Sequence, residues 1–347
     1  MAARKPRVLV IGTGGTMSAR LVKGGWKYGE ITGEELIKST PRIKEHFQIS
    51  ATNLFRMDSS DIKPAQWTTL ANAIYYSLGK YDGIVVAMGT DTLAFVAAAV
   101  SLMVQGAGIP IVFTGSRADP VALNTDATRN LRQAITVACE TDIAETMVVF
   151  NGRIIRGTRA KMVNASEFDA FQSAGEPDLG KIRQCVRITG SHRKRGKKWK
   201  PLLNTNLEED VAILKVYPGF DGNRIRHLVD YGARGIVIEG FGIGNIPLAD
   251  NRAKEGLKYA REKNVPVVVT TASLPGEDWQ YIYSLDIGKR LRGLGVIVGY
   301  DMTTETAYVK LMWCLGQTRD IGKVREMMQK NYVGEITLPK EEERRRK

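Results

Sequence analysis

The sequence is poor in the residues that build disulfides and metal sites: its 347 residues include only three cysteines and three histidines. Cys139, Cys185 and Cys314 are widely spaced and odd in number, which fits neither a disulfide framework nor a Cys-x-x-Cys metal or redox motif. The histidines are equally scattered, so no ligand cluster for a metal is visible and catalysis by histidine has little support. We therefore expect reduced thiols in the core and no bound metal.

Long hydrophobic runs are also missing. No apolar stretch approaches the roughly 20 residues that cross a bilayer, and Val8–Ile11 is too short for a signal-peptide core of about 7–15 residues. The protein is therefore expected to be soluble and cytoplasmic, with no membrane partner. Its length exceeds the usual size of one domain, which favours two domains with a sizeable core.

Positive charge is in excess but unevenly distributed. The formal net charge is +13, and removing the seven basic residues between Arg187 and Lys200 would leave +6. A solvated linker or insertion is one interpretation of this segment, and the alternative is a patch that binds nucleic acid or phosphate. Only Trp199 is interleaved with these cations as a stacking aromatic.

Short β-branched runs alternate along the chain with helix-length segments. Buried strands are expected at Val8–Ile11, Ile84–Val86, Ile109–Phe113, Met147–Phe150, Val211–Val216, Gly235–Ile238, Val265–Thr270 and Gly295–Val298. Apolar positions that recur every three to four residues predict helices over Gln66–Gly79, Leu93–Gln105, Asn124–Glu140, Asn251–Lys263 and Thr304–Leu315. This alternation predicts parallel α/β layers.

The expected architecture is two α/β domains, a larger N-terminal domain with a parallel sheet and a smaller C-terminal α/β domain. We place an N-terminal domain over residues 1–190, a basic linker over 191–208 and a C-terminal domain over 209–347. In open α/β sheets, ligands bind outside the carboxyl ends of the strands. Polar loops follow three expected strands at Thr13–Thr16, Met88–Thr92 and Thr114–Arg117, so we expect these loops to converge.

The glycine turn from Thr13 to Thr16 does not fit a nucleotide site. A dinucleotide fingerprint that starts at Gly12 would need a third glycine where Met17 stands, and the turn lacks the Gly-Lys-Ser/Thr of a P-loop. What remains is Thr16 as a potential nucleophile, which needs a base because a free hydroxyl is barely ionised at neutral pH. Taken alone, a structural turn threonine is the more ordinary interpretation.

Two further motifs supply a carboxylate, hydroxyls and an amine. Asp91 and Thr92 stand where a helix is expected to begin, so they fit helix N-caps, and Asp91 equally fits a partner for a substrate's ammonium group. Lys161 fits either a solvated lysine or, if it is buried beside a threonine and other cations, a base. In the second case Thr90, Asp91 and Lys161 form a hydroxyl, carboxylate and amine set.

An ordered set of motifs along nearly the whole chain carries a family resemblance. They are Thr13-Gly-Gly-Thr16, Asp58-Ser-Ser-Asp61, Gly89-Thr-Asp-Thr92, Arg156-Gly-Thr-Arg-Ala-Lys161, Phe168-Asp-Ala-Phe171, and Asp301-Met-Thr-Thr-Glu-Thr306 with Lys310-Leu-Met-Trp313. The set resembles the bacterial-type L-asparaginase family, especially its cytoplasmic type I and archaeal members. The resemblance implies a homo-oligomer, a homodimer or a dimer of dimers, that hydrolyses L-asparagine to L-aspartate and ammonia without a metal or organic cofactor.

The resemblance also implies roles for single residues. Thr16 matches the nucleophile that forms an acyl-enzyme, and Thr90, Asp91 and Lys161 match the second catalytic set. Tyr28 is similar to the family's lid tyrosine, which orients Thr16, and the glycines around it suit a closing loop. Backbone N–H groups near Thr16 and Thr90 would stabilise the oxyanion.

Substrate recognition is implied for a second group of positions. Ser59 and Asp91 match positions that grip the substrate's α-carboxylate and α-ammonium groups, with Ser60 close by. Asn245 matches a loop of the C-terminal domain that in the family reaches a neighbouring subunit's site. L-Glutamine is the alternative substrate, because one extra methylene changes binding by only about 1–3 kcal/mol.

Two positions depart from the family pattern. Met88 stands where the family usually has histidine, and Arg117 follows Gly115 and Ser116 where methionine or glutamine is common. Met88 removes a polar group beside the catalytic pair, and Arg117 adds a charge near the pocket. Both bear on substrate preference and rate more than on fold.

Two other functions are alternatives. The D subunit of the archaeal glutamyl-tRNA(Gln) amidotransferase, a glutaminase subunit, shares this catalytic half and resembles a chain with an additional N-terminal β domain. Because the first catalytic strand begins at Arg7, we expect a free-standing asparaginase instead. The alternative from another class is a non-catalytic module that binds nucleic acid through Arg187–Lys200.

Overall fold

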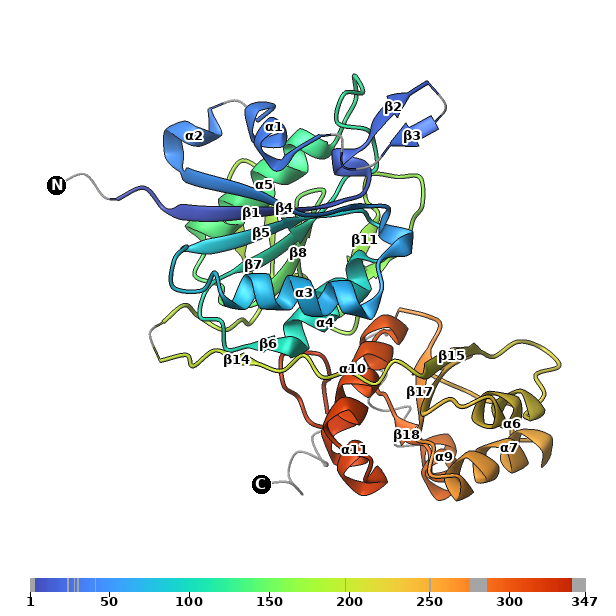
Figure 1. Cartoon of the computed structure of the whole chain (residues 1–347). Coiled ribbons are helices and arrows are strands. Elements are labelled where there is room, and N and C mark those ends of the chain that lie inside the picture. The colour runs from blue at the N-terminus through green and yellow to red at the C-terminus, as the bar shows by residue number, and fades with distance from the viewer. Residues whose placement is uncertain are drawn as a thin grey trace. The chain divides into compact units, whose positions relative to one another are not determined.

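The structure, a computed structural model, describes residues 4–338 apart from residues 24, 28, 30, 41, 197, 250 and 275–285. The chain forms two compact units. The first contains the residues up to Ser173 and those from Pro177 to Asn204, and the second contains Ala174–Glu176 and the chain from Thr205 onward. Each unit is built around its own β-sheet (Figure 1).

An eight-stranded sheet forms the centre of the first unit, in the order β13-β12-β9-β8-β7-β5-β1-β4. Five neighbouring strands are parallel: β4 (Gln48–Met57), β1 (Arg7–Gly14), β5 (Gly83–Ala87), β7 (Ile111–Thr114) and β8 (Thr146–Phe150). Three more are antiparallel to their neighbours: β9 (Arg153–Arg156), β12 (Gly180–Ile182) and β13 (Val186–Ile188). The central strands β5, β7 and β8 are buried on both faces, as expected when helices cover both sides of a parallel sheet.

Helices cover both faces of this sheet (Figure 1). They are α1 (Gly33–Lys38), α2 (Ile43–His46), α3 (Pro64–Tyr75), α4 (Leu93–Met103) and α5 (Ala127–Glu140). On one face, Leu131 and Ile135 of α5 share a buried cluster with Val8 and Val10 of β1. On the other face, every residue of α4 except Phe95 is buried, and the helix packs against α3, so the position of its first turn is fixed by packing.

Three small hairpins or ladders complete the first unit. They pair β2 (Arg20–Val22) with β3 (Gly25–Lys27), β6 (Val104–Gln105) with β14 (Leu202–Leu203), and β10 (Ala160–Met162) with β11 (Phe171–Ser173). All three pairs are antiparallel. The pair of β10 and β11 matters for the site because it fixes the position of Lys161.

A four-stranded parallel sheet forms the centre of the second unit: β15 (Val211–Lys215), β16 (Gly235–Gly240), β17 (Val267–Thr271) and β18 (Ile297–Val298). The helices described in this unit are α6 (Asn223–Asp230), α7 (Asn251–Glu262), α9 (Asp286–Gly293), α10 (Thr304–Gln317) and α11 (Ile321–Met328). A Cβ atom at Gly235 would lie 2.9 Å from side-chain carbons of Leu311 and Leu315, so glycine lets α10 pack closely on the sheet.

The predicted α/β fold, with a larger N-terminal sheet domain and a smaller C-terminal one, is confirmed. The sequence did not predict the antiparallel extension of the first sheet. Strands β9, β12 and β13 have only three or four residues each and include charged ones, so they carry little of the apolar signal that marks a buried strand. Within the part of the chain that the structure describes, no helix is long and apolar enough to span a membrane.

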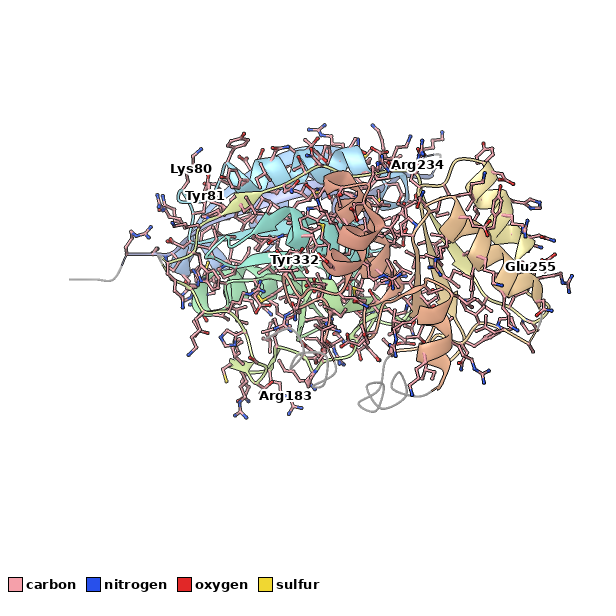
Figure 2. The ribbon with its side chains drawn as sticks, turned by 90° about the horizontal axis from the view of Figure 1, so that it is seen from below. Lys80, Tyr81, Arg183, Arg234, Glu255 and Tyr332 are labelled. Atoms are coloured by element: carbon pink, nitrogen blue, oxygen red, sulfur yellow. The ribbon has the colours of Figure 1, made fainter. Side chains whose placement is uncertain are left out.

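The basic segment Arg187–Lys200 lies along the first unit. The Arg195 guanidinium donates hydrogen bonds to the carbonyls of Ala138 and Thr141, both at 2.6 Å, and to that of Asp82. Ala138 and Thr141 lie at the carboxyl end of α5, where carbonyl groups lack partners within the helix, so this cation has a structural role. Burial lowers the pKa of Arg195. Arg183 precedes the basic segment, in the turn between β12 and β13, and its side chain extends away from the sheet (Figure 2).

Candidate active site

Glycines allow the loops at the carboxyl ends of β1, β4 and β5 to touch. Gly14 has φ +104°, and a Cβ atom there would lie 2.2 Å from the carbonyl oxygen of Met57 at the end of β4. Gly15 has φ +69°, and its Cβ atom would lie 2.2 Å from the Cα atom of Gly89. Both glycines therefore combine a left-handed conformation with a backbone approach that no other residue permits. The turn that carries Thr16 lies directly against the turn that carries Thr90.

Ser59 joins the same cluster from the loop after β4. A Cβ atom at Gly89 would lie 2.5 Å from the Ser59 hydroxyl oxygen, and Thr92 donates to the Ser59 carbonyl at 2.8 Å. The Ser59 side chain is buried, whereas Ser60 is exposed on the same short 3-10 turn, Ser59–Asp61. The structure therefore brings the loops around Thr16, Ser59 and Thr90 together, and a Cβ atom at Gly115 would lie 3.2 Å from a Thr90 methyl carbon.

The two threonines of the first turn have different surroundings. Thr13 is buried, and its hydroxyl points to the carbonyl of Ala87 at 3.4 Å, so its role is structural. Thr16 begins a 3-10 turn, Thr16–Ser18, and is only half-buried. Its hydroxyl forms no hydrogen bond with any residue that the structure describes. This leaves the Thr16 oxygen accessible to a small molecule.

The segment Thr90–Thr92 is not used for helix capping. Thr92 is the N-cap residue of α4 by position, but its side chain caps no backbone N–H and bonds to Ser59 instead. Asp91 is exposed and has no hydrogen bond or ion pair among the described residues. The N-cap interpretation of these two side chains is therefore wrong, and the Asp91 carboxylate is available to a cation from solution.

Arg117 makes the most direct contact with this cluster. Its Nη1 donates to Oγ1 of Thr90 at 2.8 Å, and its Nη2 donates to the carbonyl of Ala165. Thr90 is 3% exposed, so the guanidinium lies beside a hydroxyl that is largely shielded from water. A cation in this position favours the deprotonated form of a neighbouring acid.

Asp126 fixes the loop that carries Arg117, and the sequence alone did not identify this role. Its buried carboxylate accepts hydrogen bonds from the backbone N–H groups of Arg117 and Ala118 and from the Asn130 side chain, each at 3.0 Å. Asn130 also donates to the carbonyl of Gly115 at 3.0 Å. The available signal was an Asp at the expected start of a helix, but the side chain caps the 115–118 loop instead of α5.

The remaining predicted residues lie in different environments. Lys161 is half-buried on β10, paired in register with Gln172 of β11, and this hairpin contacts α4. Tyr28 lies outside the described residues. Met88 is fully buried, so its side chain packs into the core. Asn245 lies in the second unit, in a turn closed by reciprocal backbone hydrogen bonds with Phe241.

The cluster has the parts needed for acyl transfer. It offers two threonine hydroxyls, a free carboxylate, a guanidinium and glycine-rich backbone whose N–H groups can face a ligand. Among the described residues, no group of three or more His, Cys, Asp or Glu side chains is placed to hold a metal ion.

Family models match both units. The model for the N-terminal domain of asparaginase matches residues 7–194, and the model for the glutaminase/asparaginase C-terminal domain matches residues 210–328. Among curated relatives, the D subunit of glutamyl-tRNA(Gln) amidotransferase from Pyrococcus horikoshii is 38% identical, covering 96% of this chain and 77% of its own. The L-asparaginase of Thermococcus kodakarensis is 36% identical, covering 95% of this chain and 99% of its own.

Solved structures give the same result. The thermostable L-asparaginase of Thermococcus kodakarensis superposes with a TM-score of 0.87 at 34% identity, covering 95% of this chain and 99% of that one. L-asparaginase I of Vibrio cholerae superposes with a TM-score of 0.85 at 30% identity, covering 96% and 100%. Both family models and the solved structures therefore agree, and the chain belongs to the asparaginase family of amidohydrolase enzymes.

Proposed function

We propose that the chain is an L-asparaginase that hydrolyses L-asparagine to L-aspartate and ammonia, with Thr16 as its nucleophile. The observation that carries the proposal is the contact between the turns at Gly15 and Gly89, which brings the loops of Thr16 and Thr90 together at one edge of one sheet. Membership of the asparaginase family supports the substrate class.

The proposed reaction has two steps. Oγ1 of Thr16 attacks the side-chain amide carbon of asparagine, the nitrogen leaves as ammonia with the proton given up by the threonine, and an aspartyl ester remains on Thr16. Water then adds to the ester carbon, aspartate leaves, and Thr16 regains its proton. Both steps pass through an oxyanion, which we assign to backbone N–H groups near Thr16 and Thr90.

The other residues bind substrate and move protons. The free carboxylate of Asp91 holds the α-ammonium group, and Ser59 and Ser60 hold the α-carboxylate. Thr90 accepts a hydrogen bond from Arg117, so its own O–H can be donated to the attacking water or nucleophile, and Lys161 takes up and returns the proton. Tyr28 closes over Thr16 as a lid residue. No metal or organic cofactor takes part, and the active form is a cytoplasmic homodimer or dimer of dimers.

The test compares Thr16→Ala and Thr90→Ala with the parent enzyme and with Thr69→Ala, an exposed threonine of α3. Because loss of a nucleophile removes the covalent route, we expect ammonia release to fall about a thousandfold or more for Thr16→Ala and about a hundredfold for Thr90→Ala. Thr69→Ala should retain full activity. A Thr16→Ala variant that hydrolyses asparagine as fast as the parent would show that another residue is the nucleophile.

A glutaminase component of a tRNA-dependent amidotransferase is the second candidate. It is favoured by relatives that are D subunits of glutamyl-tRNA(Gln) amidotransferase, one of which matches 96% of this chain at 38% identity. Hydrolysis of L-asparagine and L-glutamine measured side by side separates the two. The asparaginase proposal expects the higher kcat/KM for asparagine, and a higher value for glutamine would favour the amidotransferase component.

A further inference from the structure

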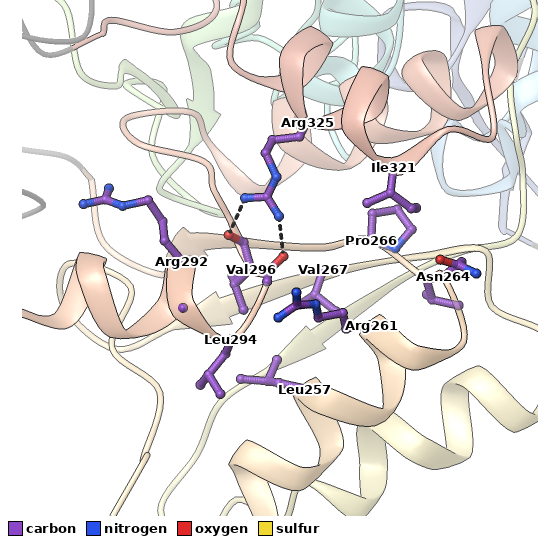
Figure 3. Close-up of a pocket in the computed structure, with 13 residues that line it drawn as sticks. Leu257, Arg261, Asn264, Pro266, Val267, Arg292, Leu294, Val296, Ile321 and Arg325 are labelled. Carbon is purple, nitrogen blue, oxygen red and sulfur yellow. Dashed lines mark hydrogen bonds between the residues drawn. The ribbon is translucent and has the colours of Figure 1, made fainter.

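A pocket of about 440 Å³ lies in the second unit, at the amino ends of β17 and β18 (Figure 3). Three arginines from three helices line it: Arg261 of α7, Arg292 of α9 and Arg325 of α11. Nothing in the proposed hydrolysis of asparagine uses these residues.

Two of these arginines converge on one turn. Gly295 has φ +87°, and a Cβ atom there would lie 2.8 Å from Cδ of Arg261, so the arginine stem lies across this glycine. Arg325 donates to the carbonyls of Gly295 at 2.7 Å and Val296 at 3.3 Å. In Figure 3 the side chains of Arg261 and Arg325 extend toward this turn from opposite sides, whereas Arg292 points away from both.

No carboxylate balances the cations within the described part of the chain. The pocket lining contains neither Asp nor Glu, and none of the three arginines forms an ion pair with a described residue. Arg261 has no hydrogen bond there either. Burial lowers the pKa of Arg325, and the charge of Arg261 lowers it further. Two guanidinium groups held this close repel each other, so an anion that binds between them gains electrostatic energy from both.

We infer that this pocket binds an organic phosphate of about the size of a nucleoside monophosphate. A phosphate group with a charge near −2 matches the two cations, and guanidinium groups bind phosphate oxygens in a bidentate manner. Arg325 keeps three of its five N–H donors after its bonds to the turn. Leu257, Leu294 and Ile321 provide apolar walls for the organic part, and the volume exceeds what inorganic phosphate needs.

Calorimetric titration of the full-length protein tests the site, with AMP, inorganic phosphate and succinate as separate probes. We expect AMP to bind, inorganic phosphate to bind more weakly, and succinate not to bind at the same concentrations. Arg261→Gln/Arg325→Gln should weaken AMP binding at least tenfold. The control Lys258→Gln/Lys323→Gln removes two exposed cations from the same helices outside the pocket and should change the affinity less than twofold.

Arg325 also holds the Gly295–Val296 turn, so its loss can unfold this region. Arg261→Gln alone avoids this difficulty, because its guanidinium supports no described residue, and it should weaken AMP binding several-fold at an unchanged melting temperature. Three results would overturn the inference: no AMP binding at millimolar concentration, equal affinity for succinate, or the same loss of affinity in the lysine control.

Discussion

At the scale of single residues, Arg117 contacts Thr90, one of the residues predicted for the site. The sequence marked Arg117 as an added charge but could not identify its partner, because a long side chain on a loop can reach many positions. In the structure, Asp126 holds the backbone at Arg117, and the guanidinium is 2.8 Å from the Thr90 hydroxyl. We expect this cation to orient the Thr90 hydroxyl, which accepts its hydrogen bond.

Replacing Arg117 tests this role. In Arg117→Gln the guanidinium beside Thr90 is lost, so we expect kcat to fall about tenfold to a hundredfold. Arg117→Lys keeps the charge and should restore part of the rate. Arg132→Gln, on the exposed side of α5, is the control. If the charge of Arg117 had no role at Thr90, Arg117→Lys would lower the rate as much as Arg117→Gln.

For Thr13, Thr16 and Asp91, the sequence predicts part of what the structure shows. Thr13 and Thr16 flank the same glycine turn, but only Thr13 is buried against a backbone carbonyl, and the role of Thr16 as nucleophile stays a prediction. The choice between helix cap and substrate ligand at Asp91 could not be made from sequence, since both roles favour the same residue type. The structure excludes the cap, because Asp91 is exposed and caps nothing, and the substrate role stays a prediction.

At the scale of elements, α10 holds the C-terminal segment through a buried ion pair. Nζ of Lys310 lies 2.7 Å from Oε1 of Glu335, both side chains are fully buried, and Nζ also donates to the carbonyls of Met328 and Lys330. Glu335 accepts two backbone N–H bonds from Tyr332 and Val333. Burial alone would raise the pKa of Glu335, but Lys310 and these hydrogen bonds outweigh it, and the net effect lowers this pKa.

This pair should make the stability of the second unit depend on pH. Because the pKa of Glu335 is lower in the folded chain than the ordinary value of 4.5, its contribution is present above that value and is lost as the pH falls through the folded pKa. Glu335→Gln leaves a buried lysine without its partner and should cost about 3–5 kcal/mol at pH 7. Urea unfolding between pH 7 and pH 3 measures both effects.

The matched control is Glu262→Gln, an exposed acid at the end of α7. It should leave the free energy of unfolding nearly unchanged at pH 7. The free energy of unfolding of the parent should fall faster than that of Glu335→Gln as the pH is lowered. If it does not, the pH dependence does not come from this pair.

Helices and strands with strong apolar patterns could be predicted from the sequence. Strands with weak apolar patterns could not. The predicted strand at Ile84–Val86 and the predicted helix at Leu93–Gln105 correspond closely to β5 and α4, both of which are buried. Strand β4 was missed because it lies at the edge of the sheet and its sequence mixes polar and apolar residues without a continuous apolar run. It nevertheless places Ser59 in the site.

At the scale of the whole molecule, the uneven charge distribution bears on the choice between an asparaginase and a component of a tRNA-dependent amidotransferase. Arg195 is bound to the end of α5, whereas Lys194, Lys198 and Lys200 are exposed.

We expect Lys194→Gln/Lys198→Gln/Lys200→Gln to leave hydrolysis of asparagine unchanged. Weak binding of unfractionated tRNA to the parent should disappear between about 50 and 200 mM salt. If the parent bound tRNA tightly at the higher salt concentration, and the triple variant lost this binding, the result would favour the amidotransferase component.

Whether Thr16 forms the acyl-enzyme is measured by rapid acid quenching of the enzyme during turnover of L-asparagine, followed by peptide mapping with mass spectrometry. We predict that the peptide that contains Thr16 gains the mass of one aspartyl group in ester linkage, and that this adduct is absent from Thr16→Ala. An aspartyl ester on Thr90, with Thr16 unmodified, would contradict the assignment.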